Sequence, residues 1–143
     1  VFGGAGVGAD GVIDVDALNG ADGYRISTMF DSGFSVASVG DVNQDGAGDI
    51  LIGAPHYSPH IGVVETGAAY LVFGGAGVGA SGSLMLDSVD DGTNGILYRA
   101  TIDTQAGFSV SSAGDVNADS IPDFLVGAPI VAPSAAATDG PPG

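Results

Sequence analysis

The stretch FSVASVGDVNQDGAGDILIGAP, residues 34–55, decides how the rest of the chain is read. It joins two short apolar runs, Phe34 to Val39 and Ile50 to Ile52, through an acidic loop. The first run alternates large and small residues, and Gly53-Ala54-Pro55 ends the second, which is typical of β-strands bounded by turns. The stretch therefore predicts a pair of strands that carries a loop rich in oxygen atoms.

The same pattern returns as FSVSSAGDVNADSIPDFLVGAP at residues 108–129, and VFGGAGVGA at 1–9 returns unchanged at 72–80. A repeat at a fixed spacing indicates an architecture of similar units. We predict a first unit at residues 1–74, which begins with the end of a preceding strand at 1–4. The second unit is expected at residues 75–143, without its last strand. The chain is expected to be a piece taken from a longer run of such units.

Each unit holds about four strand candidates. AAYLVF at residues 68–73 is a third apolar run, and Tyr24 to Ile26 and Leu97 to Thr101 are weaker ones. No segment has sustained helical periodicity, although Val12 to Leu18 could form a single turn. Because parallel strands need long crossover connections that the spacing does not provide, we expect antiparallel meanders.

A four-stranded sheet cannot bury both faces alone, so each unit needs neighbours of its own kind. That requirement fits the blades of a β-propeller or another stacked array. The fold class is therefore expected to be all-β, with about two blades of a larger propeller or assembly. Two blades cannot close a propeller, which typically has four to eight. We expect further blades in the same chain or a homo-oligomeric assembly.

The acidic loop of each unit presents oxygen donors at its first, third, fifth and ninth positions and a backbone carbonyl at its seventh. Such spacing on a tight turn suits Ca²⁺, whose ligands are oxygen atoms in loose geometry. The predicted ligands are Asp41, Asn43, Asp45, the Ala47 carbonyl and Asp49 in the first loop, and Asp115, Asn117, Asp119, the Ile121 carbonyl and Asp123 in the second.

Other metal sites fit the loops less well. An EF-hand wants a glutamate at position 12, where this chain has Ile52 and Val126. The chain has no cysteine and no histidine within the loops, which argues against zinc or copper. The alternative to a calcium site is an acidic, solvated hairpin turn. Ser120 stands where the first loop has Gly46, so we expect the second turn to form without free access to positive φ and to bind more weakly.

The charge balance restricts the partners. The net charge is −15, with two arginines and no lysine, and such a field repels nucleic acid and anionic membrane surfaces. No apolar run reaches the roughly 18 residues of a membrane helix, so no membrane insertion is expected. The acidity weakly favours an extracellular setting.

Other motifs give weaker evidence of a functional site than the acidic loops do. Gly4 to Ala9 fits the loose form G-x-G-x-x-A of a dinucleotide fingerprint, but no helix is expected after it. His56 and His60 lie in a proline-containing loop, which favours an ordinary exposed loop over a metal site. Arg25 and Arg99 occupy matching places in the two units, which favours a structural role. No nucleophile and base stand out as a pair, so we expect no enzyme.

Residues 34–55 followed by AAYLVFGG resemble the FG-GAP repeat of integrin α-subunits and many bacterial surface proteins. Phe73-Gly74 and Gly53-Ala54-Pro55 match the two halves of that name, and the second unit keeps Gly127-Ala128-Pro129. The resemblance implies seven-bladed propellers with calcium in the aspartate-rich loop between the first two strands of a blade. A bacterial surface type is expected.

Three functions stay open. The first is a calcium-binding propeller segment of a secreted or cell-surface protein, which serves adhesion or binds protein or carbohydrate without catalysis. The second is a structural subunit of a surface fibre or assembly. The third is a non-catalytic part of a secreted polysaccharide-acting enzyme, since propellers host many functions.

Overall fold

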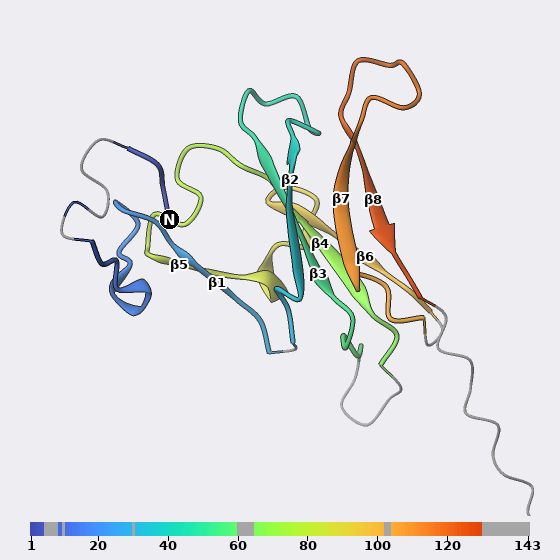
Figure 1. Cartoon of the computed structure of the whole chain (residues 1–143), viewed down its shortest axis with the longest axis horizontal. Helices are drawn as coiled ribbons and strands as arrows, with labels where there is room; N and C mark the ends of the chain where they lie inside the picture. Colours follow the sequence, from blue (N-terminus) through green and yellow to red (C-terminus); the bar gives the residue numbers. More distant parts are fainter. Residues whose placement is uncertain (5–8, 10, 30, 60–64, 102–103, 130–143) are drawn as a thin grey trace, which may run out of the picture.

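The computed structural model describes residues 1–4, 9, 11–29, 31–59, 65–101 and 104–129. The regular secondary structure of these residues consists of strands apart from two short 3-10 turns, which confirms the all-β expectation (Figure 1). None of the helices in these ranges is long or apolar enough to cross a membrane. The elements in chain order are the 3-10 turn η1 (Val15–Ala17), β1 (Arg25–Ser27), β2 (Ser35–Gly40), β3 (Asp49–Ala54), β4 (Ala68–Val72), β5 (Ser83–Met85), the 3-10 turn η2 (Leu86–Ser88), β6 (Gly95–Arg99), β7 (Ser109–Gly114) and β8 (Asp123–Gly127).

The central sheet has four strands in the order β2-β3-β4-β6, and every neighbouring pair is antiparallel. All five residues of β4 are buried, and so are five of the six in β3. A run that is buried at every position needs cover on both faces of its sheet. The edge strands β2 and β6 carry most of the exposed residues.

Both faces of this sheet are covered (Figure 1). Ile26 of β1, Leu84 of β5 and Leu86 of η2 pack on one face, and the hairpin of β7 and β8 packs on the other. The first face presents Ile52, Ala54, Ala68, Tyr70 and Val72, and the second presents Val39, Leu51, Ala69, Leu71 and Phe73. The fold therefore has three layers, with β3 and β4 at their centre.

The pair formed by β1 and β5 is parallel, with Arg25 opposite Ser83 and Ser27 opposite Met85. The expectation of antiparallel pairing throughout is wrong for this pair. The central strands β2, β3 and β4 lie between β1 and β5 in the chain, and this long connection supplies the crossover that parallel pairing requires. A strand was not expected at β5, because its apolar run, Leu84 to Leu86, is only three residues long and ends in η2.

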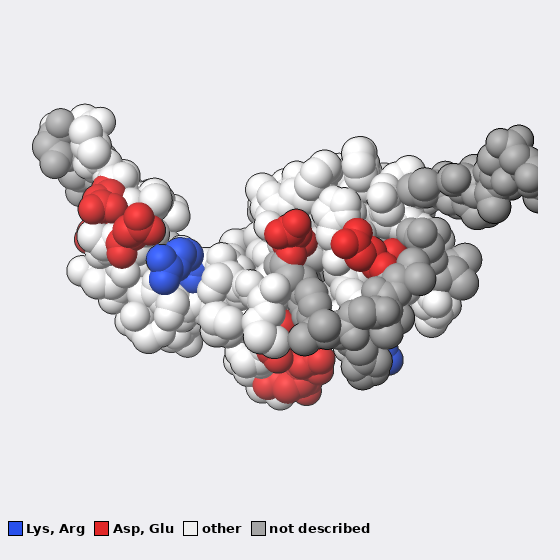
Figure 2. Space-filling model, turned by 90° about the horizontal axis from the view of Figure 1, so that it is seen from below, with Lys and Arg blue, Asp and Glu red and all other residues white. Residues whose placement is uncertain are grey.

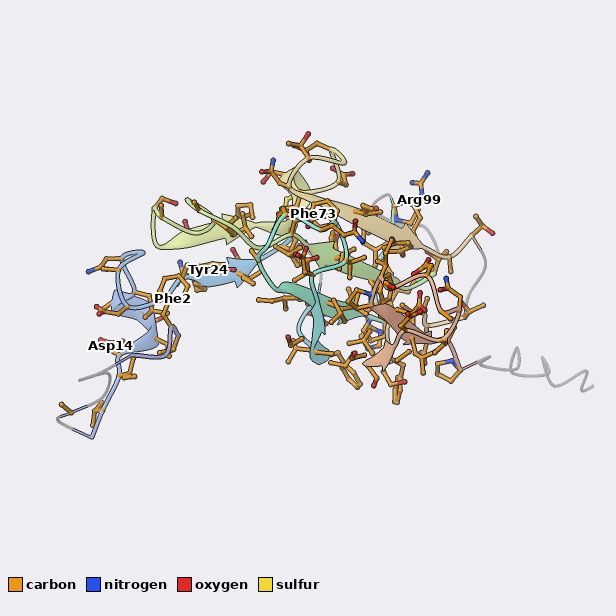
Figure 3. The ribbon with its side chains drawn as sticks, turned by 90° about the horizontal axis from the view of Figure 1, so that it is seen from above. Phe2, Asp14, Tyr24, Phe73 and Arg99 are labelled. Atoms are coloured by element: carbon orange, nitrogen blue, oxygen red, sulfur yellow. The ribbon has the colours of Figure 1, made fainter. Side chains whose placement is uncertain are left out.

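The central sheet takes its fourth strand, β6, from beyond the predicted boundary between residues 74 and 75. The sequence unit and the sheet are therefore offset by one strand. An equivalent bond appears before the sheet, where the Phe2 amide donates to the Asp22 carbonyl at 2.9 Å, as the Phe73 amide donates to the Asn94 carbonyl at 3.0 Å. Phe2 also lies beside Tyr24, with ring centroids 5.7 Å apart (Figure 3).

Tyr70 on β4 is expected to make the folded chain less stable at alkaline pH. Its side chain is 1% exposed, and burial raises its pKa from 10.0 to about 12, with the Asp87 charge adding to the shift and a hydrogen bond with Thr28 opposing it. Between these two values the unfolded chain loses a proton that the folded chain keeps, so stability falls as pH rises. We expect Tyr70→Phe to remove most of this loss in urea unfolding at pH 9 to 12, whereas Tyr98→Phe should remove less.

Candidate metal loops

The two acidic loops join β2 to β3 and β7 to β8, and they project at the same end of the molecule (Figure 1). A register shift precedes each loop, between Ser38 and Gly40 in the first hairpin and between Ser112 and Gly114 in the second. Such a bulge bends a strand locally and re-aims the residues that come after it. The repeat in the sequence is thus a repeat in backbone geometry.

The first loop is held by its own carboxylates. Asp41 accepts hydrogen bonds from the amides of Asp45 at 3.0 Å and Gly46 at 2.8 Å. The Asp45 carboxylate accepts the Ala47 amide at 2.8 Å and the Asn43 side-chain amide at 2.8 Å. The Asn43 oxygen in turn accepts the Asp45 amide at 3.1 Å. These side chains therefore gather around one tight turn.

The second loop repeats this pattern bond by bond. Asp115 accepts the amides of Asp119 at 3.1 Å and Ser120 at 2.8 Å. Asp119 accepts the Ile121 amide at 2.8 Å and the Asn117 side-chain amide at 2.9 Å, and the Asn117 oxygen accepts the Asp119 amide at 2.9 Å. The change from Gly46 to Ser120 leaves the hydrogen bonds of the loop in place.

Ser120 reaches that geometry by adopting φ 71°, close to the 91° of Gly46. The second turn was expected to form without the free access to positive φ that glycine has, and the serine does enter the left-handed region, at a cost of about 1–2 kcal/mol. Gln44 and Ala118 also have positive φ, at 61° and 63°. The hydrogen bonds to Asp115 and Asn117 offset this strain.

The last aspartate of each loop is placed differently. Asp49 is 0% exposed, and its carboxylate accepts the Val42 amide at 2.8 Å and the Gly74 amide, just beyond β4, at 2.8 Å. Asp123 accepts the Val116 amide at 2.8 Å, and its other oxygen has no partner among the residues described here. Asp49 thus ties the loop to a third strand. Sequence patterns carry no sign of this role because Gly74 lies 25 residues away.

The donor chemistry of the loops suits a hard cation. The side-chain donors of both loops are carboxylate and amide oxygens, which fit Ca²⁺, and carboxylate oxygens keep lone pairs beyond those used in the turn. In this conformation, however, no group of three or more His, Asp or Glu side chains within the described ranges is arranged to hold a metal ion. Figure 2 shows several acidic patches on one face and only two small basic areas. The chemistry of the loops fits calcium, although their carboxylates face backbone amides.

Within the described residues, the remaining candidates form no second site. His56 pairs with Glu65 at 2.8 Å, and His60 lies outside the described residues. Arg25 pairs with Asp16 at 3.5 Å, whereas Arg99 points away from the ribbon (Figure 3). Residues 5–8 of the first glycine-rich run lie outside the described ranges. The second run leads into β5 rather than a helix, and it lines a cavity of about 510 Å³ that the sequence did not indicate.

Comparison with known proteins agrees with these features. Residues 32–72 match the FG-GAP repeat family. The chain is 39% identical to phosphatidylinositol-glycan-specific phospholipase D of Bos taurus over 92 residues, which cover 64% of this chain and 10% of that protein. It is 36% identical to integrin alpha-6 of Gallus gallus over 108 residues, 76% of this chain and 9% of that protein.

Integrin alpha-6 of Homo sapiens is also 36% identical over 108 residues, 76% of this chain and 8% of that protein. The chain therefore spans a tenth or less of the length of these relatives. The bacterial surface type stays a prediction. The FG-GAP match, the integrin relatives and the antiparallel sheets together identify the chain as an integrin-like FG-GAP repeat protein whose sheets fit the blades of a β-propeller.

Proposed function

We propose that the chain is a calcium-binding segment of a larger β-propeller in an extracellular or cell-surface protein, where it serves adhesion by binding a protein or carbohydrate ligand without catalysis. The observation that carries this proposal is the pair of acidic loops with one hydrogen-bond pattern, in a chain related to integrin alpha-6. The proposed ligands of Ca²⁺ are Asp41, Asn43, Asp45, Ala47 and Asp49, and Asp115, Asn117, Asp119, Ile121 and Asp123.

The ion would act on stability rather than on a reaction. Asp41, Asp45 and Asp49 bring three negative charges to one short loop, and six of the 17 acidic residues of the chain lie in the two loops. Like charges held close together repel each other, and a divalent cation offsets that repulsion. A cation held by side chains from both ends of the loop would fix the β2–β3 connection and the surface loops beside it.

Calcium is therefore expected to stabilise the folded chain. At a free concentration one hundred times the Kd of one site, the gain is about 2.7 kcal/mol, provided that the unfolded chain does not bind. The measurement is thermal unfolding of the 143-residue chain, followed by circular dichroism in excess chelator, in CaCl₂ and in MgCl₂. The midpoint should rise with calcium and rise less with magnesium, which prefers a tighter octahedral shell.

Two variants separate specific binding from charge neutralisation. Asp41→Asn removes a loop charge, and Asp91→Asn removes an equal charge from an exposed turn outside the loops. The calcium-induced rise should shrink in the first variant and persist in the second. A midpoint that chelator and calcium leave unchanged in the parent chain would contradict the metal proposal.

A second candidate function rests on the similarity to a phosphatidylinositol-glycan-specific phospholipase D. In this alternative the blades are the non-catalytic part of a secreted enzyme, and the reaction takes place in another region of the protein. The flanking sequence of the full-length protein decides between the two candidates. Adhesion of cells to the immobilised chain, lost on adding chelator, would favour the first; a catalytic domain in the flanking sequence would favour the second.

A further inference from the structure

Two of the four asparagines in the chain, Asn19 and Asn94, are followed directly by glycine. In such a pair the backbone nitrogen of the glycine can attack the side-chain carbonyl carbon of the asparagine, because glycine has no Cβ to obstruct the approach. The attack requires an N–H group that is not held in a hydrogen bond, and it requires space for a five-membered ring. The two pairs differ in both respects.

The two pairs lie in corresponding turns but at opposite ends of them. The first turn reads Asn-Gly-Ala-Asp-Gly at residues 19–23, and the second reads Asp-Gly-Thr-Asn-Gly at residues 91–95. In each turn the amide of the second residue, Gly20 or Gly92, donates to the carbonyl of the fifth residue at 3.0 Å. The nitrogen that would attack the first asparagine is therefore held by its turn.

The nitrogen that would attack Asn94 belongs to Gly95, and the register of β4 with β6 leaves it outside the ladder. The Phe73 amide donates to the Asn94 carbonyl at 3.0 Å, and Val72 lies opposite Gly95. Because antiparallel pairs alternate between bonded and non-bonded positions, the Gly95 N–H points to the outer edge of β6. Among the described residues this N–H has no hydrogen-bond acceptor.

Asn94 also has more room than its counterpart. It is exposed and lines the cavity of about 510 Å³ beside the second glycine-rich run, so water reaches its side chain. The first pair is crowded, because a Cβ at Gly20 would overlap the Ala80 carbonyl oxygen. Each asparagine side chain makes one hydrogen bond within its turn. The difference between the two pairs therefore lies in the attacking nitrogen and the space around it.

We propose that Asn94 and Gly95 form a site of spontaneous deamidation in the folded chain. The Gly95 nitrogen forms a bond to Asn94 Cγ, and the bond from Cγ to the side-chain nitrogen breaks. That nitrogen leaves as ammonia and takes the proton of the Gly95 amide with it, so the product is a succinimide ring. Water then adds to one of the two ring carbonyls and opens the ring to aspartate or isoaspartate. Water is the one co-reactant.

The conversion alters the turn from which β6 begins. Hydrogen bonds from the Asn94 and Thr93 amides lower the pKa of Asp91, so its carboxylate is ionised at neutral pH. The Asn94 side-chain amide donates to this carboxylate at 2.7 Å. Either product replaces that donor by a second carboxylate, and like charges repel each other. Isoaspartate also adds one carbon atom to the backbone, which displaces β6 against β4.

The experiment compares the two pairs in the same molecule. The 143-residue chain is incubated in neutral buffer with chelator and, in parallel, in the same buffer with denaturing urea. Chymotryptic peptides are then followed by mass spectrometry, and isoaspartate is labelled with isoaspartyl methyltransferase. In the folded chain Asn94 should convert about tenfold faster than Asn19, since the Gly20 amide must first give up a hydrogen bond. In urea the two rates should become similar.

Asn94→Ser is the matched control, because serine cannot form the succinimide. After the same incubation the thermal midpoint of the parent chain should fall in proportion to the fraction converted, whereas that of the variant should stay constant. Conversion of Asn19 at least as fast as that of Asn94 in the folded chain would overturn the proposal, and so would conversion of Asn94 in urea alone. An equal fall of the midpoint in parent and variant would refute the effect on β6.

Discussion

Replacing Asp49 with alanine is expected to lower the free energy of unfolding by roughly 3–5 kcal/mol, because the amides of two half-buried residues lose a buried, charged acceptor. The carboxylate is 0% exposed and bonds Val42 and Gly74 at 2.8 Å each. The measurement is urea unfolding in excess chelator, followed by circular dichroism.

The repeat provides the matched control. Asp123→Ala removes the equivalent carboxylate, which is half-buried and holds one described amide. Its expected cost is about 1–2 kcal/mol. Because both variants remove one charge at the same loop position, the difference measures the bond to Gly74 and the effect of burial. Equal losses in the two variants would refute the role assigned to Asp49.

Gly107→Ala is the second substitution with a large expected effect, about 2–5 kcal/mol of lost stability. Gly107 has φ +85°, which a side chain disfavours, and a Cβ there would overlap the Ala68 carbonyl oxygen. The Ser35 hydroxyl also donates to the Gly107 carbonyl at 3.0 Å, where the two hairpins meet. Neither sheet can shift without disturbing the other.

Gly33 is the equivalent residue of the first unit, with φ +79° and no atom within 4 Å of an added Cβ. Gly33→Ala should therefore cost only the conformational part, about 1–2 kcal/mol. Urea unfolding of both variants compares the same backbone strain with and without a steric clash. A loss for Gly107→Ala no larger than that for Gly33→Ala would show that the hairpins separate easily.

Local patterns were enough to predict much of the fold. Ser35–Gly40, Asp49–Ala54 and Ala68–Val72 form strands where short apolar runs lie between glycine, proline and aspartate, and the turn within residues 12–18 forms as η1. These features depend on neighbouring residues, so the sequence carries them directly. The hydrogen-bonded turns of both acidic loops follow equally from the local alternation of Asp and Asn.

The features that the sequence could not predict depend on contacts between distant segments. β1 and β5 pair although β2, β3 and β4 lie between them in the chain, and the Gly74 amide bonds to Asp49, which is 25 residues away. The positive φ of Ser120 is a further case, because propensity disfavours it and the hydrogen bonds of the loop decide. Metal binding by either loop stays a prediction.

The offset between the sequence unit and the sheet has a consequence for synthesis. The central sheet is complete only when β6 has formed, so the first 74 residues lack one of its strands as they leave the ribosome. Until β6, which ends at Arg99, has been synthesised, the edge of β4 that faces away from β3 lacks its partner strand. The first predicted unit therefore cannot complete the central sheet by itself, and we expect its folding to be coupled to that of the unit that follows.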